Sequence, residues 1–255
     1  MNQIPKVIHY CWFGRNPLPP MAEKCIASWR KFLPDYEIKE WNEDNFDVTM
    51  NAYIDEAYNM KKFAFVSDFA RFWILYHHGG VYFDVDVEVI KPMDDIIAKG
   101  PFMGLENLER GLIYRDCKAL PAAGLGMAAY PKMPLLEDLL HYYNNKHFIS
   151  LKGKAELKTV VLIVTDVLLD RGGTIDGKSI SVCSEMHLYP SDYFNPKSLS
   201  TGVITLTDNT RSIHHFAGTW VDRKKVRGLK RHWIRLKNLM LRLRLSVKRA
   251  FKCKK

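Results

Sequence analysis

The stretch Phe65–Ile90, FVSDFARFWILYHHGGVYFDVDVEVI, changes its hydrophobic period halfway along, and the rest of the chain is organised around this change. Its first half predicts a helix, because aromatic residues recur there at helical spacing. These residues are Phe69, Phe72, Trp73 and Tyr76. Ser67 is expected to cap the start of the helix by accepting a hydrogen bond from a free backbone N–H. Gly79 and Gly80 are expected to end it, since glycine adopts the left-handed conformation without a clash at Cβ.

The second half of the stretch predicts a strand that runs to Val89, because its side chains alternate with a period of two. One face of this strand would carry Val81, Phe83, Val85, Val87 and Val89. The other face would carry Tyr82, Asp84, Asp86 and Glu88. The acidic residues therefore share one face, and that face is the candidate for chemistry.

Asp84 and Asp86 are predicted to bind a divalent cation. Two neighbouring carboxylates among apolar residues cost free energy unless a positive charge compensates them. Mg²⁺ or Mn²⁺ supplies that charge and prefers oxygen ligands, often one or two carboxylates together with substrate phosphates. The alternative is an edge strand whose acidic face lies in water. The Gly-Gly entry from a helix favours a site, because ligands of open α/β sheets bind beyond the carboxyl ends of strands.

The segments around this stretch predict an α/β layer in a single domain. Residues 7–13 read as a buried strand, residues 21–32 as a helix and residues 36–41 as a second strand, which together make a βαβ unit. A further amphipathic helix is expected at residues 134–143.

The net charge of +10 divides unevenly between the body and the end of the chain. Residues 223–255 contain fifteen Lys or Arg and no acidic residue, so residues 1–222 hold 23 basic and 28 acidic side chains. The apolar residues of this tail recur three or four apart, at Leu229, Trp233, Leu236, Met240, Leu243, Val247 and Phe251. This pattern is typical of a basic amphipathic helix that lies in a membrane interface. Packing on the body or on a second copy, and binding to nucleic acid, are the alternatives, with nucleic acid not expected.

Five scattered cysteines without a Cys-x-x-Cys pair predict neither a zinc knuckle nor a disulfide framework. A reducing cytoplasm suits this pattern. The first residues show no signal-peptide pattern. The expected location is therefore cytoplasmic, peripheral on the inner face of the cytoplasmic membrane.

Three blocks of the sequence resemble glycosyltransferase family 32, the DXD-type sugar transferases. They are IPKVIHYCWFG at residues 4–14, SDFARFWILYHHGGVYFDVDVEVI at residues 67–90 and SIHHFAGTW at residues 212–220. This family includes bacterial capsule and O-antigen enzymes and the yeast initiating mannosyltransferases, and the catalytic domains of clostridial glucosylating toxins are more distant relatives. The resemblance implies a GT-A-type, Rossmann-like domain at residues 1–222, with a mixed, mostly parallel sheet and the tail at residues 223–255.

The resemblance also implies roles for single residues. Trp12 would stack on the uracil of the donor, Asp68 would accept hydrogen bonds from sugar hydroxyls, and Arg71 would reach the sugar or a phosphate. Ser67, Tyr82 and Asp84 would lie in the same donor site, and Thr219 and Trp220 would cover the diphosphate. The block His215-Phe216-Ala217-Gly218 makes His215 the expected third metal ligand, with Asp84 and Asp86. His214 would point the other way in an extended segment, although either histidine remains open as the ligand.

The function implied by the resemblance is metal-dependent, retaining transfer of a hexose from a UDP-sugar to a lipid-linked glycan in capsule or O-antigen synthesis. Galactose is the first choice of sugar; UDP-glucose, UDP-N-acetylglucosamine and GDP-mannose remain open. Asp84, Asp86, Asp68 and Arg71 are the expected catalytic residues, and Glu106 is a candidate on the acceptor side. Two other classes remain: a toxin-like protein O-glycosyltransferase, and a nonenzymatic nucleic-acid binder that uses the basic tail. A homo-oligomer is possible in any of these cases.

Overall fold

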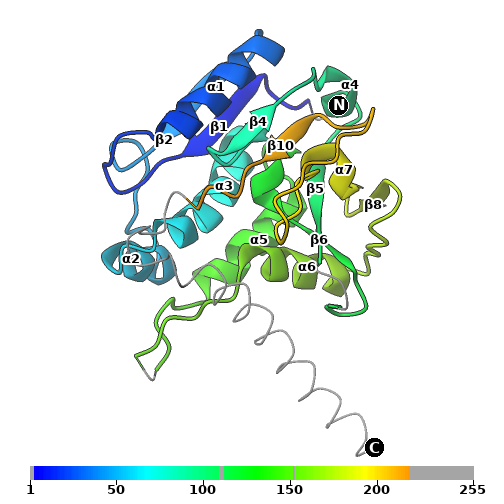
Figure 1. Ribbon diagram of the computed structural model, residues 1–255. Helices are drawn as coiled ribbons and strands as arrows, with labels where there is room; N and C mark the ends of the chain where they lie inside the picture. Colours follow the sequence, from blue (N-terminus) through cyan, green and yellow to red (C-terminus); the bar gives the residue numbers. More distant parts are fainter. Residues whose placement is uncertain (1–2, 109–111, 152, 219–255) are drawn as a thin grey trace, which may run out of the picture.

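The computed structural model describes residues 3–108, 112–151 and 153–218, which hold a mixed sheet with helices on both faces (Figure 1). The helices are α1 (Pro20–Phe32), α2 (Ala52–Asn59), α3 (Phe63–His78), α4 (Asp94–Ile97), α5 (Pro134–Asn144), α6 (Val160–Asp170) and α7 (Ser191–Phe194), with the 3-10 turn η1 (Ala123–Leu125). The strands are β1 (Val7–Cys11), β2 (Glu37–Trp41), β3 (Gly80–Tyr82), β4 (Val87–Val89), β5 (Phe102–Asn107), β6 (Ala119–Pro121), β7 (Met127–Ala129), β8 (Ser181–Cys183), β9 (Met186–Tyr189) and β10 (Ser212–His214).

The main sheet of the described residues has the strand order β2-β1-β3-β7-β5-β9-β8, with β6 paired to β5 beside this path. Strands β2, β1 and β3 run parallel to one another. Strand β7 is antiparallel to both β3 and β5, so β5 points the same way as β3, and β9 is parallel to β5. Five strands therefore share one direction, and the prediction of a mixed, mostly parallel α/β sheet is confirmed.

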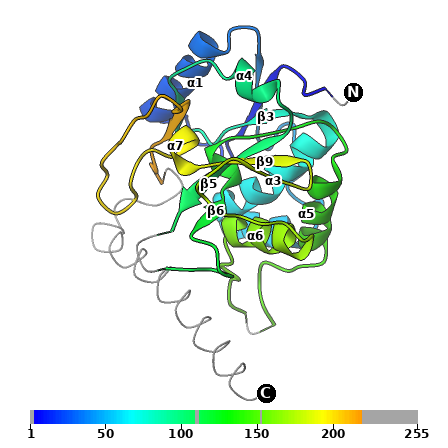
Figure 2. The ribbon, with the colours of Figure 1, turned by 90° about the vertical axis from the view of Figure 1, so that its right-hand side faces the viewer.

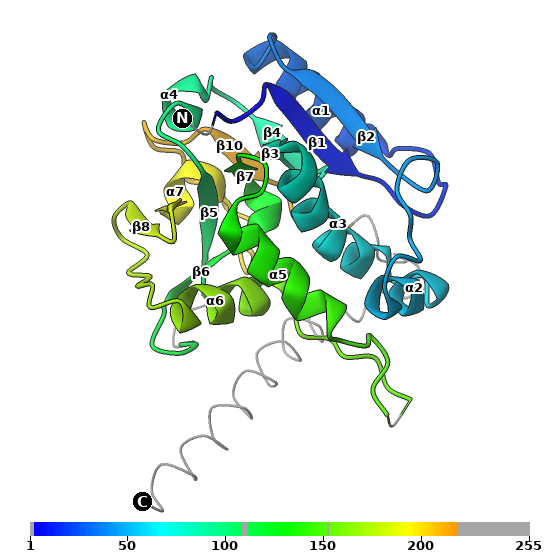
Figure 3. The same cartoon turned by 180° about the vertical axis from the view of Figure 1, so that it is seen from behind.

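The two faces of the sheet are covered by different elements (Figure 3). Helices α3 and α5 pack side by side on one face, while α1 and the small antiparallel pair β4–β10 lie on the other. Helix α1 holds this pair in place through Trp29, whose indole N–H donates to the carbonyl oxygen of Val87 at 2.7 Å. The hydroxyl of Ser28, the residue before Trp29, accepts a hydrogen bond from the backbone N–H of Val89 at 2.9 Å.

Helix α3 ends where its glycines predict, but it begins earlier than expected. Gly79 follows its last residue with φ 65° and Gly80 has φ 101°. A Cβ on Gly80 would lie 2.6 Å from the carbonyl oxygen of Val7, so this position requires glycine. The prediction that Ser67 caps the helix is wrong, because the helix starts at Phe63 and the Ser67 hydroxyl donates to the Phe63 carbonyl oxygen at 3.1 Å.

The single strand predicted for residues 81–89 is also wrong, because the chain leaves the main sheet at Tyr82 and enters the β4–β10 pair at Val87. A turn between them is closed by the backbone N–H of Val87, which donates to the Asp84 carbonyl oxygen at 3.0 Å. The alternating pattern continues through the turn because Phe83, just before it, and Val85, within it, are both buried in the core. The two aspartates therefore lie in a turn that follows the carboxyl end of β3.

Candidate donor and metal site

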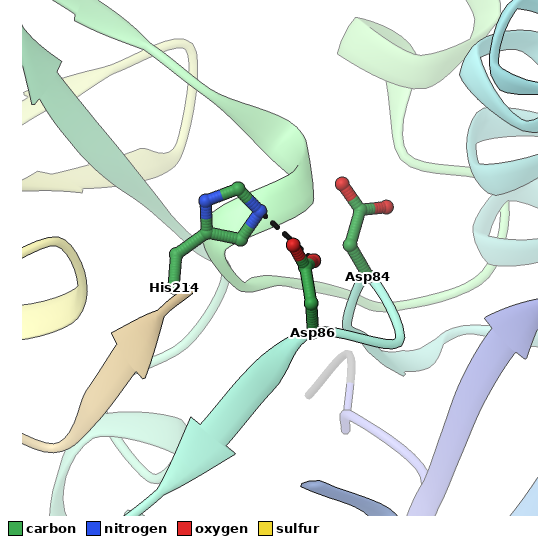
Figure 4. Close-up of side chains that lie close together, drawn as sticks. All are labelled: Asp84, Asp86 and His214. Atoms are coloured by element: carbon green, nitrogen blue, oxygen red, sulfur yellow. Dashed lines mark ion pairs between the residues drawn. The ribbon is translucent and has the colours of Figure 1, made fainter. Parts of the chain in front are cut away.

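Asp84, Asp86 and His214 bring their side chains together where the chain crosses between the two sheets (Figure 4). One ligand atom from each of the three lies within 4.8 Å of the others. His214 Nε2 is 3.1 Å from Asp86 Oδ1, and both side chains are nearly buried, with 13% and 10% of their surface exposed. Two carboxylates and one imidazole form a donor set that suits Mn²⁺ or Mg²⁺.

Two further interactions hold Asp86 in this position. Its Oδ2 accepts a hydrogen bond from the backbone N–H of Ala217 at 2.7 Å, and its carbonyl oxygen accepts one from the N–H of His215 at 2.9 Å. Burial by itself raises the pKa of Asp86, but the charge of His214 and the Ala217 N–H outweigh it, so the pKa falls to about 2. Burial likewise lowers the pKa of His214, and the charges of Asp86 and Asp84 outweigh it, so that pKa rises. The site is therefore preorganised around a carboxylate that stays ionised.

His214 supplies the imidazole of this cluster, and the prediction of His215 is corrected. Strand β10 pairs antiparallel with β4 so that His214 lies opposite Val87, next to Asp86. His215 faces elsewhere, because its Nε2 lies 2.7 Å from Glu88 Oε2, and Lys24 holds the other oxygen of Glu88 at 3.0 Å. The two histidines point to opposite sides, as predicted, but it is His214 and not His215 that faces Asp86. His214 Nδ1 is buried and has no hydrogen-bond partner among the described residues, so this nitrogen is available for one more polar contact.

Arg71 links the aspartates of helix α3 and of the turn. Its guanidinium lies 2.9 Å from Asp68 Oδ1 and 3.2 Å from Asp84 Oδ1, and only 4% of its side chain is exposed. Its Nε–H donates to the Ser67 carbonyl oxygen at 3.1 Å, and its Cζ lies 5.0 Å from the centre of the Tyr82 ring. The Tyr82 hydroxyl donates to Asp84 Oδ1 at 3.2 Å. Four of the predicted donor-site residues thus form one continuous network with the metal cluster.

The remaining predicted residues occupy different places. Trp12 follows β1, whose parallel register with β3 puts it at the same sheet edge as Asp84, and its indole N–H donates to the Asn16 carbonyl oxygen at 2.6 Å. Glu106 lies near the carboxyl end of β5, and its charge helps to raise the pKa of His214. Thr219 and Trp220, and the predicted tail at residues 223–255, lie outside the described residues.

Gly124 is a functional residue that the sequence did not reveal. It lies in η1, and its carbonyl oxygen accepts a hydrogen bond from the backbone N–H of Asp84 at 3.1 Å. A Cβ at this position would lie 2.0 Å from Asp84 Oδ2 and 3.3 Å from a guanidinium nitrogen of Arg71. Nothing in the local sequence marks this contact, because it joins segments forty residues apart.

The change Gly124→Ala is expected to displace the Asp84 carboxylate and to lower kcat/KM by about a hundredfold, since a shift of about 1 Å at a reacting centre has an effect of that size. Gly173→Ala is the matched control, because its added Cβ would lie 1.9 Å from Cys183 Sγ, an equally severe clash away from the site. Steady-state kinetics of both variants test this, and equal losses in the two would contradict the role of Gly124.

Asp68 gives the unfolding free energy a pH dependence of definite sign. Burial raises the pKa of this carboxyl group from 3.8 to about 7, against the opposing charge of Arg71. A group with a raised folded-state pKa contributes stability that is complete below its unfolded pKa and is lost as the pH rises through the folded one. The stability of the wild type relative to Asp68→Asn should therefore fall between about pH 4 and about pH 7 and then level off. Urea titrations at stepped pH measure it, and a constant difference would contradict it.

Comparison with known proteins shows which proteins the segment that carries the site is similar to. Residues 19–103, which contain Asp68, Arg71, Asp84 and Asp86, match the family described as glycosyltransferase sugar-binding region containing DXD motif. Inositol phosphoceramide mannosyltransferase 1 of Schizosaccharomyces pombe is 30% identical over 162 residues, covering 58% of this chain and 46% of that protein. Initiation-specific alpha-1,6-mannosyltransferase of Candida albicans is 25% identical over 183 residues, covering 66% of this chain and 44% of that protein.

The chain spans less than half the length of these curated relatives. Among solved structures, the PaToxG glycosyltransferase is similar with a TM-score of 0.47 and 16% identity, covering 66% of this chain and 69% of that one. A glycosyltransferase involved in the glycosylation of the major capsid of PBCV-1 gives a TM-score of 0.45 and 12% identity, covering 87% of this chain and 99% of that one. These two likenesses are partial, and no further argument rests on them.

Proposed function

We propose, from the match of residues 19–103 to the glycosyltransferase sugar-binding region containing a DXD motif, that the chain is a metal-dependent, retaining hexosyltransferase. The observation that carries the proposal is the joining of Asp84, Asp86 and His214 at the end of a network that also contains Asp68 and Arg71. A cation site beside a buried arginine with two carboxylates suits a substrate that has both a diphosphate and a sugar.

Asp84, Asp86 and His214 would hold the metal. When bound, a Mn²⁺ or Mg²⁺ ion supplies positive charge against the nucleoside diphosphate that leaves in the reaction. The protein contributes the fixed positions of the three ligands: Asp86 is held by Ala217, Asp84 by Tyr82 and Arg71, and His214 by the register of β10.

The donor sugar would lie over Asp68 and Arg71. The pair is positioned before the donor binds, since Arg71 is fixed by two carboxylates and a helix carbonyl oxygen. Such preorganisation lowers the entropic cost of placing the sugar for attack by the acceptor hydroxyl. Trp12 at the same edge would stack on the base of the nucleotide.

A UDP-hexose is the proposed donor, with UDP-galactose as the first choice from the family resemblance. The names of the relatives introduce a second candidate, because two of those cited above are mannosyltransferases. GDP-mannose is therefore tested beside UDP-galactose, UDP-glucose and UDP-N-acetylglucosamine.

The proposed acceptor is a lipid-linked glycan of capsule or O-antigen synthesis, used at the inner face of the cytoplasmic membrane. The fifteen basic residues of 223–255 support a membrane location, since each contributes about 1 kcal/mol near an anionic leaflet. One relative is named for inositol phosphoceramide, which is a lipid, and this adds support for a lipid acceptor. In the described part of the chain, no helix combines the length and apolar character needed to cross a bilayer.

A thermal-shift screen of the four nucleotide sugars, with and without Mn²⁺, tests the proposed function. We expect one of them to raise the melting temperature in the presence of Mn²⁺ and to have little effect in EDTA, because a ligand that binds the folded state stabilises it by mass action. The Asp86→Asn variant should lose the Mn²⁺-dependent part of the shift. The absence of any shift with all four donors, in wild type with Mn²⁺, would refute the proposal.

A further inference from the structure

Exposed aliphatic residues gather in one loop beside the candidate site. Among the described residues, eleven large hydrophobic side chains are exposed, and four of them lie within eight positions of one another. They are Leu199 at 42% exposure, Val203 at 60%, Ile204 at 42% and Leu206 at 55%. Single exposed aliphatic residues are ordinary, but a cluster of four indicates a surface that something covers. We call residues 196–206 the apolar loop.

The apolar loop has a defined backbone. The N–H of Ser198 donates to the Val203 carbonyl oxygen at 2.9 Å, and the N–H of Thr205 donates to the Pro196 carbonyl oxygen at 3.1 Å. A β-bridge between Lys197 and Ile204 closes it. In Figure 2 the loop stands off the body at the left, between α7 and β10. These hydrogen bonds hold the backbone of the loop in shape. Its aliphatic side chains therefore do not need to pack against the protein core.

The base of the loop touches the candidate site. Lys197 Nζ donates to the His215 carbonyl oxygen at 2.8 Å, and the N–H of His215 donates to the Asp86 carbonyl oxygen at 2.9 Å. Two hydrogen bonds therefore connect the loop to the residue that would hold the metal. Whatever covers the loop therefore lies close to the candidate metal site.

The charges of the loop and of the rest of the chain indicate what kind of partner the loop contacts. The loop itself contains one lysine and no acidic residue, and its other polar residues are small serines and threonines. Asp192 and Asp208 lie just outside its two ends, where Thr207 Oγ1 donates to Asp192 Oδ2 at 3.1 Å. The described part of the chain ends at residue 218, three residues beyond the contact with Lys197, and fifteen basic residues follow within 223–255. An apolar loop whose single charge is Lys197, in a chain whose residues 223–255 are strongly basic, matches a bilayer with anionic lipid, which offers both an apolar interior and negative headgroups.

We propose that the apolar loop inserts its aliphatic side chains into the surface of an anionic bilayer and so holds the candidate site at the membrane. The choice of a lipid-linked acceptor rests on the proposed function, but the binding of the loop to lipid does not. The consequence is an enzyme whose site is fixed at the depth where a lipid-linked sugar ends and its membrane anchor begins.

Partition of the full chain onto vesicles of phosphatidylcholine and phosphatidylglycerol tests the proposal. The loop variant replaces Leu199, Val203, Ile204 and Leu206 by serine, and the control variant replaces Ile180 and Val182, which are 40% and 61% exposed elsewhere, by serine. We expect the partition coefficient of the loop variant to fall by about tenfold or more, since four aliphatic groups no longer leave water. The control variant should bind as the wild type does. Equal binding of all three proteins would overturn the proposal.

Hydrogen exchange of the wild type tests the proposal without any substitution that could change the fold. Addition of vesicles should slow exchange of the amides of residues 198–206 and leave residues 180–182 unchanged, and unchanged exchange in the loop would overturn the proposal. Light scattering without lipid should give one mass for wild type and loop variant. A larger mass for the wild type that falls in the loop variant would assign the loop to a second copy and overturn the membrane role.

The same samples separate this inference from the proposed function. The loop variant should keep the Mn²⁺-dependent thermal shift with the donor, since none of its four changes touches the metal cluster. If no nucleotide sugar binds to any of the proteins, the proposed function fails, while vesicle binding that depends on the loop still supports the membrane contact.

Discussion

Replacing Asp86 with alanine is expected to lower kcat/KM for sugar transfer by at least about a thousandfold, because charge stabilisation by a bound metal contributes several kcal/mol to the barrier and each ~1.4 kcal/mol is tenfold in rate. Asp86 is the member of the cluster that touches both the imidazole of His214 and the backbone N–H of Ala217. Removal of its carboxylate therefore loosens the turn and the β10 segment together. EDTA should reproduce the loss in the wild type, and Mn²⁺ should restore it.

Two variants define the origin of that loss. Asp86→Asn keeps the shape of the side chain and an oxygen for the Ala217 N–H, so a loss as great as that of the alanine variant assigns the effect to charge. Glu88→Gln changes a carboxylate two residues away that pairs with Lys24 and His215, and it should cost less than about tenfold. Product formation with radiolabelled donor measures all three. Full transfer in EDTA, or by Asp86→Ala, would exclude a metal role for this residue.

Replacing Arg71 with methionine is expected to lower the free energy of unfolding by about 3–5 kcal/mol near pH 8, which is the usual cost of removing one partner from a buried ion pair. The guanidinium is 4% exposed and compensates two carboxylates, Asp68 and Asp84. Without it, two negative charges remain close together with little water to screen them. Urea unfolding followed by circular dichroism measures the change.

The same explanation predicts two further results. The cost should shrink towards pH 5, where Asp68, with its pKa of about 7, takes up a proton. Addition of Asp68→Asn to the Arg71→Met variant should recover part of the loss, as expected for residues in contact. Arg115→Met is the matched control: this arginine also bridges two carboxylates, Asp166 and Asp170, but is 33% exposed, so its removal should cost under about 1 kcal/mol. Equal costs at the two positions would contradict the role of burial.

The helix α3 shows how far local patterns reach. Its aromatic spacing and its terminal glycines are local signals, and both correctly predicted the helix and its end. Its start was missed because Lys62 precedes it without a side-chain cap, so the first turn carries no capping signal. Ser67, which looked like a cap, uses its hydroxyl inside the helix.

The site shows what lies beyond the reach of local patterns. Asp84 and Asp86 could be found because they sit in one short stretch whose charge is unusual for its apolar surroundings, whereas Asp68 and Arg71 were assigned from the family resemblance. The correct histidine could not be found, since two adjacent histidines differ only in the face they present, and the pairing of β10 with β4 decides that face. The contact of Gly124 with Asp84 depends on the packing of η1 against the turn and has no counterpart in spacing or composition.

The crossing of the chain from the main sheet to the β4–β10 pair has a consequence for synthesis. Asp86 and His214 are 128 positions apart, so the ribosome releases the two aspartates long before it has made the imidazole that joins them. A growing chain shorter than 214 residues cannot assemble the three ligands, however well its first strands have paired. If these three residues hold the ion together, as proposed, the complete site can capture it only after the last strand of the described body has been translated.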